Sequence, residues 1–165
     1  MDTGEARPRR HFTASGYVVH QGRVLLHWHR KVRAFLPPGG HIEADEDPVE
    51  ALLREVREET GLAVEVLTAG LALGVSYPIQ VPSPEVIMVE DIRDPVDGFH
   101  QHMDMIYFCR PVGSLDNLKD GWHWVREVEL ASGAAVAGGE GEGASPSPDV
   151  RRLALEALRR EREGA

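Results

Sequence analysis

Three glutamates, Glu55, Glu58 and Glu59, lie close together in the stretch REVREETGL. At about 100° per residue these positions share one face of a helix. Like charges at such spacings repel by a few tenths of a kcal/mol per pair, and a bound cation would reverse that sign. Oxygen ligands suit hard cations such as Mg²⁺, Mn²⁺ or Ca²⁺. The alternative is a solvated acidic face in which Arg54 pairs with Glu50 and Glu58.

The segment before these glutamates, RKVRAFLPPGGH, predicts a rigid loop. Pro37 and Pro38 carry no backbone N–H, and Gly39 and Gly40 allow backbone angles that other residues avoid. A bare backbone therefore precedes the acidic helix.

The helix itself has clear start and stop signals. Asp47 suits the N-cap, Pro48 suits the first helical position, and Glu50 completes a capping box with Asp47. Gly61 is expected to end the helix. An apolar stripe for docking on a sheet is formed by Val49, Leu52, Leu53 and Val56.

From Gly40 to Leu62 the chain resembles the signature of the Nudix hydrolases, Gx5Ex7REUxEExGU, in which U is an aliphatic residue. Nine specified positions fall in a 23-residue frame, which leaves little room for an accidental match. All nine are filled, by Gly40, Glu46, Arg54, Glu55, Val56, Glu58, Glu59, Gly61 and Leu62.

The resemblance implies an α/β/α sandwich around a mixed β-sheet, with the signature forming a loop, helix, loop unit. It implies hydrolysis of a nucleoside diphosphate linked to another moiety X, with Mg²⁺ as cofactor and Mn²⁺ as a substitute. Carried onto this chain, the metal ligands are Glu55, Glu58 and Glu59, joined by the backbone carbonyl of Gly39. Glu55 or Glu58 is the expected general base.

The same resemblance assigns supporting roles. Glu46 and Arg54 are expected to brace the loop against the helix. Arg54 is also expected to be one of the catalytic residues. Gly40 opens the loop, and Gly61 ends the helix in a mainly structural role.

Positive charge precedes the glycine loop in HWHRKVR, where Arg30, Lys31 and Arg33 could meet substrate phosphates. The alternative is a solvated loop. Trp28 could stack on a nucleotide base, whereas Phe35 is expected in the core.

The stretch HQHMDMIYF carries His100, His102 and Asp104 in alternation, which places them on one face of a strand. They could form a metal site, but a hydrogen-bonded pair lining the substrate pocket is favoured because no fourth strong ligand stands at useful spacing.

Four further acidic residues could supply a distal ligand or base, although exposed loop acids are the common case. They are Asp116, Asp120, Glu90 and Asp91.

The composition of the chain limits the kinds of partner that it is expected to bind. The net charge of -9 disfavours binding to nucleic-acid polymers and anionic lipid, and Arg7, Arg9 and Arg10 read as a solvated tail. The single Cys109 lies in an apolar run and is expected to be a core thiol. No signal peptide or run of roughly 18 apolar residues is visible, so a cytoplasmic protein without membrane contact is expected.

Three segments are expected along the 165 residues: a domain over 1–130, a flexible connector rich in Gly, Ala, Ser and Pro over 131–148, and a C-terminal helix over 149–165. Tight-turn residues Gln21 and Gly22 predict a hairpin before the glycine loop. Strands are also predicted at VEVLTAGLALGV, PEVIMVEDI, MDMIYFCR and WHWV. The C-terminal helix is expected to dock on the same domain, with docking on a partner as the alternative.

The leading substrates are nucleoside triphosphates or modified dNTPs. ADP-ribose, dinucleoside polyphosphates and nucleotide sugars are the enzymatic alternatives, because loops outside the signature choose X. A non-catalytic nucleotide sensor is the alternative from another class, and the complete glutamate set argues against it. Homodimers are common in the family, so a homodimer is also considered.

Overall fold

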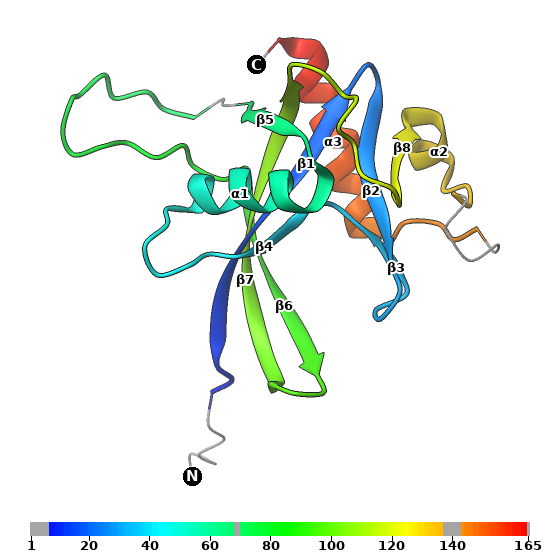
Figure 1. The fold of residues 1–165 in the computed structure, drawn as a ribbon, viewed down its shortest axis with the longest axis horizontal. Helices are drawn as coiled ribbons and strands as arrows, with labels where there is room; N and C mark the ends of the chain where they lie inside the picture. The colour runs from blue at the N-terminus through cyan, green and yellow to red at the C-terminus, as the bar shows by residue number, and fades with distance from the viewer. Residues whose placement is uncertain (1–6, 68–69, 137–142, 165) are drawn as a thin grey trace.

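The computed structural model describes residues 7–67, 70–136 and 143–164 (Figure 1). Within these ranges one mixed sheet has the strand order β3-β2-β1-β7-β5, with β4 on β1, β6 on β7 and β8 on β2. β1 and β7 run parallel, and the other pairs are antiparallel. The strands are β1 (Arg10–His20), β2 (Arg23–His29), β3 (Ala34–Leu36), β4 (Gly39–His41), β5 (Ala63–Val66), β6 (Val86–Asp94), β7 (Gly98–Val112) and β8 (Trp122–Arg126).

Helices cover both faces of this sheet. They are α1 (Pro48–Thr60), α2 (Glu127–Ser132) and α3 (Pro148–Glu163). Side chains alternate along β1, so that Ala14 and Val18 pack in the core under α1, whereas Tyr17 and Val19 pack in the core under α3. The predicted α/β/α sandwich around a mixed sheet is confirmed.

The predicted first hairpin is present. Gln21 and Gly22 have φ of 50° and 73°, the positive values that a two-residue turn between twisted strands requires. Phe35 and Cys109 are fully buried, as expected of core residues.

The C-terminal part is more closely packed than its composition indicated. Val136, inside the expected connector, is buried and pairs with Ala144. Residues 137–142 of the connector lie outside the described residues. α3 packs on the sheet through its buried face of Val150, Ala154, Ala157 and Leu158.

The predicted strand after Gly61 is shorter than expected. β5 ends at Val66, and residues 70–85 form neither helix nor strand, although they include Leu71, Tyr77 and Ile79. These three side chains are exposed. Apolar composition alone did not form a strand here, because no described neighbouring strand pairs with this segment.

Among the described residues, no helix combines the length and apolar character needed to span a bilayer.

Candidate metal and catalytic site

The acidic helix α1 is fixed at both ends. The Asp47 side chain accepts hydrogen bonds from the Val49 and Glu50 amides at 2.8 and 2.9 Å, and Glu50 accepts one from the Asp47 amide at 2.9 Å. At the other end Gly61 has φ 79° and donates its N–H to the Arg57 carbonyl. The sequence predicted both caps, and they fix where the helix begins and ends.

The short strand β4 runs beside this helix. It pairs with β1 so that Gly39 lies opposite Ser15 and Gly40 opposite Ala14. The Gly39 N–H donates to Glu59 Oε2 at 3.0 Å. A Cβ at Gly40 would lie 2.4 Å from Glu55 Oε1. The Glu55 carboxylate therefore lies where a side chain at Gly40 would stand, and the Glu59 carboxylate is bonded to the Gly39 backbone.

Arg54 ties the loop after β4 to the helix. It holds Glu46 through two parallel bonds, Nε to Oε1 at 2.6 Å and Nη2 to Oε2 at 2.9 Å. It also donates to Glu55 Oε1 at 2.7 Å and to the His41 carbonyl at 3.1 Å. The bonds from Arg54 hold the pKa of Glu46 below its usual value, and the same bonds raise the pKa of Arg54. The predicted bracing pair is in contact.

The three glutamates repel one another in this arrangement. Burial raises the pKa of Glu59, and the charges of Glu55 and Glu58 raise it further, against the opposing effect of the Gly39 hydrogen bond. Glu58 points outward, with 62% of its side chain exposed and its Oε2 3.5 Å from Arg54 Nη1.

A divalent cation fits this donor set. The oxygens come from Glu55 and Glu59, with Glu58 at the edge, and all are hard ligands without sulfur or imidazole. The space that a side chain at Gly40 would fill is occupied by the Glu55 carboxylate. Hard cations such as Mg²⁺ or Mn²⁺ prefer oxygen ligands of this kind.

A cavity of about 800 Å³ opens beside these carboxylates, between β4, β6, β7 and the start of α3. Its volume falls in the range of small-molecule sites. The lining includes Gly39, Gly40, His41, Glu59, Glu90, His102, Asp104 and Asp149.

The three cations of the β2–β3 loop separate in space. Lys31 lines the cavity, whereas Arg30 and Arg33 are exposed and are not among the described lining residues. Trp28 packs edge-on against Phe35 with ring centroids 5.3 Å apart, in the core under α3. The structure therefore places Trp28 partly buried against the core and not among the described residues that line the cavity.

The residues of β7 share a face, as their alternation predicted. His102 and Asp104 line the cavity, and His100 is buried with its Nε2 3.2 Å from His102 Nε2. Asp104 accepts a hydrogen bond from Thr13 Oγ1 at 2.9 Å. Burial raises the pKa of Asp104.

The remaining acidic candidates lie in different places. Glu90 lines the cavity, and burial followed by the charges of Asp104 and Asp149 raises its pKa. Asp91 accepts a bond from the Gln101 side chain at 3.0 Å. The loop residues Asp116 and Asp120 are exposed and are not among the described lining residues.

Sequence reasoning missed His11, His41 and Asp149. No local spacing links them to the glutamates, since β1, β4 and α3 are brought to the cavity only by the sheet pairing and by the packing of α3.

Comparison with known protein families decides the family. Residues 9–141 match the model of the NUDIX domain. The chain belongs to the NUDIX family. The resemblance seen in the signature is confirmed, and Nudix hydrolases generally depend on divalent cations and act on small nucleotides.

Individual Nudix relatives agree with this placement. A curated protein of Lactococcus lactis subsp. cremoris, named "Probable DHNTP pyrophosphohydrolase", is 28% identical over 104 residues, which cover 63% of this chain. The matched part spans only 56% of that relative's length.

Solved Nudix structures share the fold. A NUDIX-family hydrolase from Clostridium perfringens is 26% identical, with a TM-score of 0.72 over 92% of this chain and 97% of that chain. A mutator MutT protein from Bacillus halodurans is 18% identical, with a TM-score of 0.55 over 90% of this chain and 82% of that chain. The second likeness concerns the fold alone.

Proposed function

We propose that this Nudix protein is a divalent-metal-dependent pyrophosphohydrolase that cleaves a nucleoside diphosphate linked to another group X. The observation that carries the proposal is the convergence of Glu55 and Glu59 on the bare backbone of Gly39 and Gly40. Arg54 holds this arrangement from both the loop and the helix. A protein that only bound nucleotides would not need three crowded carboxylates.

The chemistry is a water attack on phosphorus, which forms a new P–O bond and breaks the bridging P–O bond. A bound Mg²⁺ or Mn²⁺ would neutralise phosphate charge and lower the pKa of a bound water. The chain supplies the ligands Glu55, Glu58 and Glu59 and the carbonyl of Gly39. Lys31 on the cavity wall attracts the anionic substrate.

The general base is assigned to Glu55 or Glu58. Their surroundings differ, because Arg54 donates to Glu55 at 2.7 Å while Glu58 is largely exposed. Comparing the pH–rate profiles of Glu55→Gln and Glu58→Gln distinguishes them, since only loss of the base removes the acid limb.

The leading substrates are nucleoside triphosphates and modified dNTPs. Glu90, Asp104 and Asp149 meet in the cavity, and carboxylates accept hydrogen bonds from N–H groups. This wall favours a heterocycle with an amino or imino edge. The name of the Lactococcus relative supports a pyrophosphohydrolase and adds DHNTP to the compounds to test.

Other Nudix substrates are the alternatives. Solved proteins named "UDP-X diphosphatase" and "Ap4A Hydrolase" share the fold at 14% identity, so the fold does not choose among substrates. ADP-ribose, dinucleoside polyphosphates and nucleotide sugars therefore belong in the same panel.

The test is a panel of these compounds with Mg²⁺ or Mn²⁺, in which the release of phosphate, pyrophosphate and nucleotide products is measured separately. We expect metal-dependent product release that favours triphosphates with amino-bearing bases. Tight binding without product from any compound would support a nucleotide sensor and overturn the hydrolase.

A further inference from the structure

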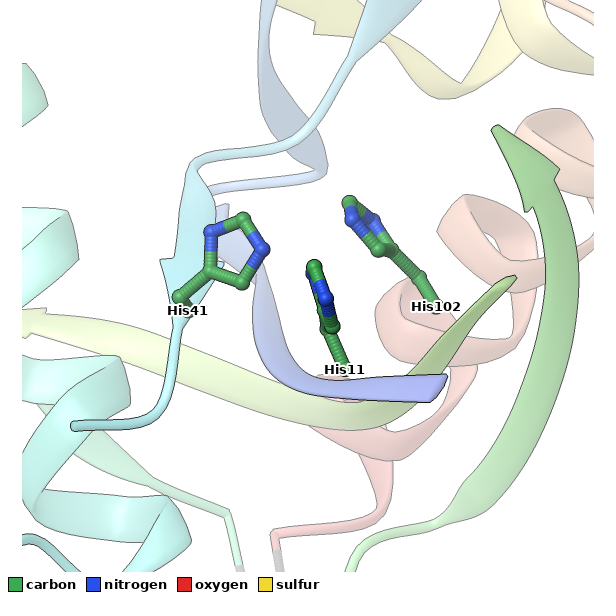
Figure 2. Close-up of side chains that lie close together, drawn as sticks. All are labelled: His11, His41 and His102. Atoms are coloured by element: carbon green, nitrogen blue, oxygen red, sulfur yellow. The ribbon is translucent and has the colours of Figure 1, made fainter. Parts of the chain in front are cut away.

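Three histidines from three strands gather at the edge of the cavity. His11 belongs to β1, His41 to β4 and His102 to β7, and Figure 2 shows their rings side by side on one side of the sheet. One ring nitrogen from each lies within 4.8 Å of the others.

Strand register explains why they meet. His11 and His102 are direct partners in the parallel pair of β1 and β7. His41 lies opposite Thr13, two residues further along β1, and residues two apart share a face of a strand. The rings are thus held by the backbone pairing of three strands, and no mobile loop carries them.

The crowding of these rings disfavours protonation of His102. The centroid of His41 is 5.4 Å from that of His11 and 5.0 Å from that of His102. Burial, followed by the neighbouring His41, His100 and His11, lowers the pKa of His102 to about 4. A neutral imidazole has one unprotonated nitrogen, which is the form that binds a metal.

His100 supplies an outer partner for His102. His100 Nδ1 lies 3.2 Å from the Gly98 carbonyl, which can only accept, so His100 Nδ1 carries the proton. His100 Nε2 is then an acceptor for His102 Nε2–H at 3.2 Å, and the lone pair of His102 is on Nδ1. Histidines that bind metals commonly donate their other N–H to such a partner.

The distances require a modest adjustment. Tetrahedral zinc with Zn–N bonds of about 2.0–2.1 Å places its ligand nitrogens about 3.3 Å apart, compared with the spread of up to 4.8 Å here. Rotation of the exposed His41 and half-buried His11 rings closes this difference without moving a strand. His100 is already bonded to His102 and is not available as a fourth ligand. A water or a substrate atom would complete the coordination.

We propose that His11, His41 and His102 bind a borderline divalent transition cation such as Zn²⁺, at a site separate from the Glu55 and Glu59 carboxylates. Neutral imidazole suits Zn²⁺, Cu²⁺ and Ni²⁺, whereas carboxylate oxygens suit Mg²⁺ and Mn²⁺. The site does not depend on the proposed hydrolase activity. Because His41 and His102 line the cavity, an ion there adds positive charge to a largely acidic wall.

The direct test is calorimetric titration of metal-free, full-length protein with ZnCl₂ at neutral pH, without nucleotide. The variants are His11→Gln with His102→Gln, His41→Gln alone, and Glu59→Gln. His20→Gln, on the same strand as His11 but outside the cluster, is the matched control.

We expect one zinc site in the wild type, in Glu59→Gln and in His20→Gln. Both histidine-cluster variants should weaken it by more than about tenfold, the loss that even removal of an outer partner produces. Because His41 is exposed, His41→Gln should remain folded. It therefore tests the site even if the double variant fails to fold. Co²⁺ titration should give a visible absorption spectrum of an imidazole-bound ion in the wild type and lose it in His41→Gln.

Three results overturn the proposal. The wild type binds no zinc, His41→Gln binds zinc as the wild type does, or Glu59→Gln loses the zinc site. The last result would assign zinc to the carboxylates and leave the histidines as a cluster of packed rings.

Discussion

The carboxylate cluster of α1 and the imidazole cluster at the cavity edge are assembled in different ways. Glu55 and Glu59 come from one helix, and their separation is set by helical geometry. His11 and His102 come from strands far apart in the chain, and their separation is set by the register of β1 and β7. A site whose residues lie close together in the chain can be predicted from the sequence. A site whose residues meet only through strand register cannot.

The two clusters also differ in chemistry. The first offers oxygen donors whose repulsion a hard cation relieves, and the second offers nitrogen donors that suit a borderline cation. β4 touches both, through Gly39 and Gly40 on one side and His41 on the other. Substitutions that change one cluster and leave the other intact test this comparison.

The largest effect is expected from Glu59→Gln. Turnover should fall by roughly two to four orders of magnitude, because a metal ligand is lost beside the attacking water. Gln can still accept the Gly39 hydrogen bond, and the buried charge is removed, so the melting temperature in chelator should stay equal or rise.

The control for this variant is Glu65→Gln, an exposed glutamate of β5 that pairs with Arg110. It should leave turnover unchanged. Wild-type turnover in Glu59→Gln would remove the carboxylate cluster from the proposed mechanism.

A smaller effect is expected from Gly40→Ala. The new Cβ would lie 2.4 Å from Glu55 Oε1, and the carboxylate can move away because it ends a flexible side chain. Displacing it by about 1 Å should cost about 100-fold in turnover with little loss of stability. Zinc binding at the histidines should be kept.

Gly39→Ala is the matched comparison. Its Cβ would lie 2.5 Å from the Ala14 carbonyl oxygen and 2.7 Å from the Ser15 Cα, which are backbone atoms that cannot give way. We expect a loss of about 1–3 kcal/mol in the free energy of unfolding, measured with denaturant. Equal stability in the two variants would contradict this account of β4.

The smallest effect is expected from Asp104→Asn, between the two clusters. Burial raises the pKa of Asp104, so the folded protein holds this proton more tightly than the unfolded chain. Wild-type stability should therefore fall as pH rises through the raised pKa. Asn removes that dependence and can still accept from Thr13.

Thermal melts of both proteins across pH provide the measurement. The melting temperature of the variant should rise relative to that of the wild type as pH rises above the ordinary carboxyl pKa of about 4. Below that pH the difference in melting temperature should vanish. A difference that does not vary with pH would show that Asp104 is ionised alike in both states.

Much of the α1 region was predictable. Asp47, Glu50 and Gly61 act through bonds within a few residues, so their types and spacing predicted the observed caps. Cys109 and Phe35 were also placed correctly in the core, because apolar runs bounded by turns form buried strands.

Other features depend on partners that a single sequence does not name. The strand expected beyond Val66 is absent from the described residues, and Val136 enters the core by pairing with Ala144. Lys31 reaches the cavity while Arg30 and Arg33 do not, because the turn between β2 and β3 directs neighbouring side chains differently. Each outcome is decided by packing between distant segments.

The three-residue strand β4 contributes to both clusters, so metal binding at one cluster can be coupled to metal binding at the other. If an ion at the imidazole cluster changes the cation affinity of Glu55 and Glu59, a cation at these glutamates changes the affinity of the imidazole cluster by the same factor. A metal-occupancy measurement at either cluster would then report the state of the other, so this glycine-rich strand would link an oxygen-ligand site and an imidazole site by reciprocity.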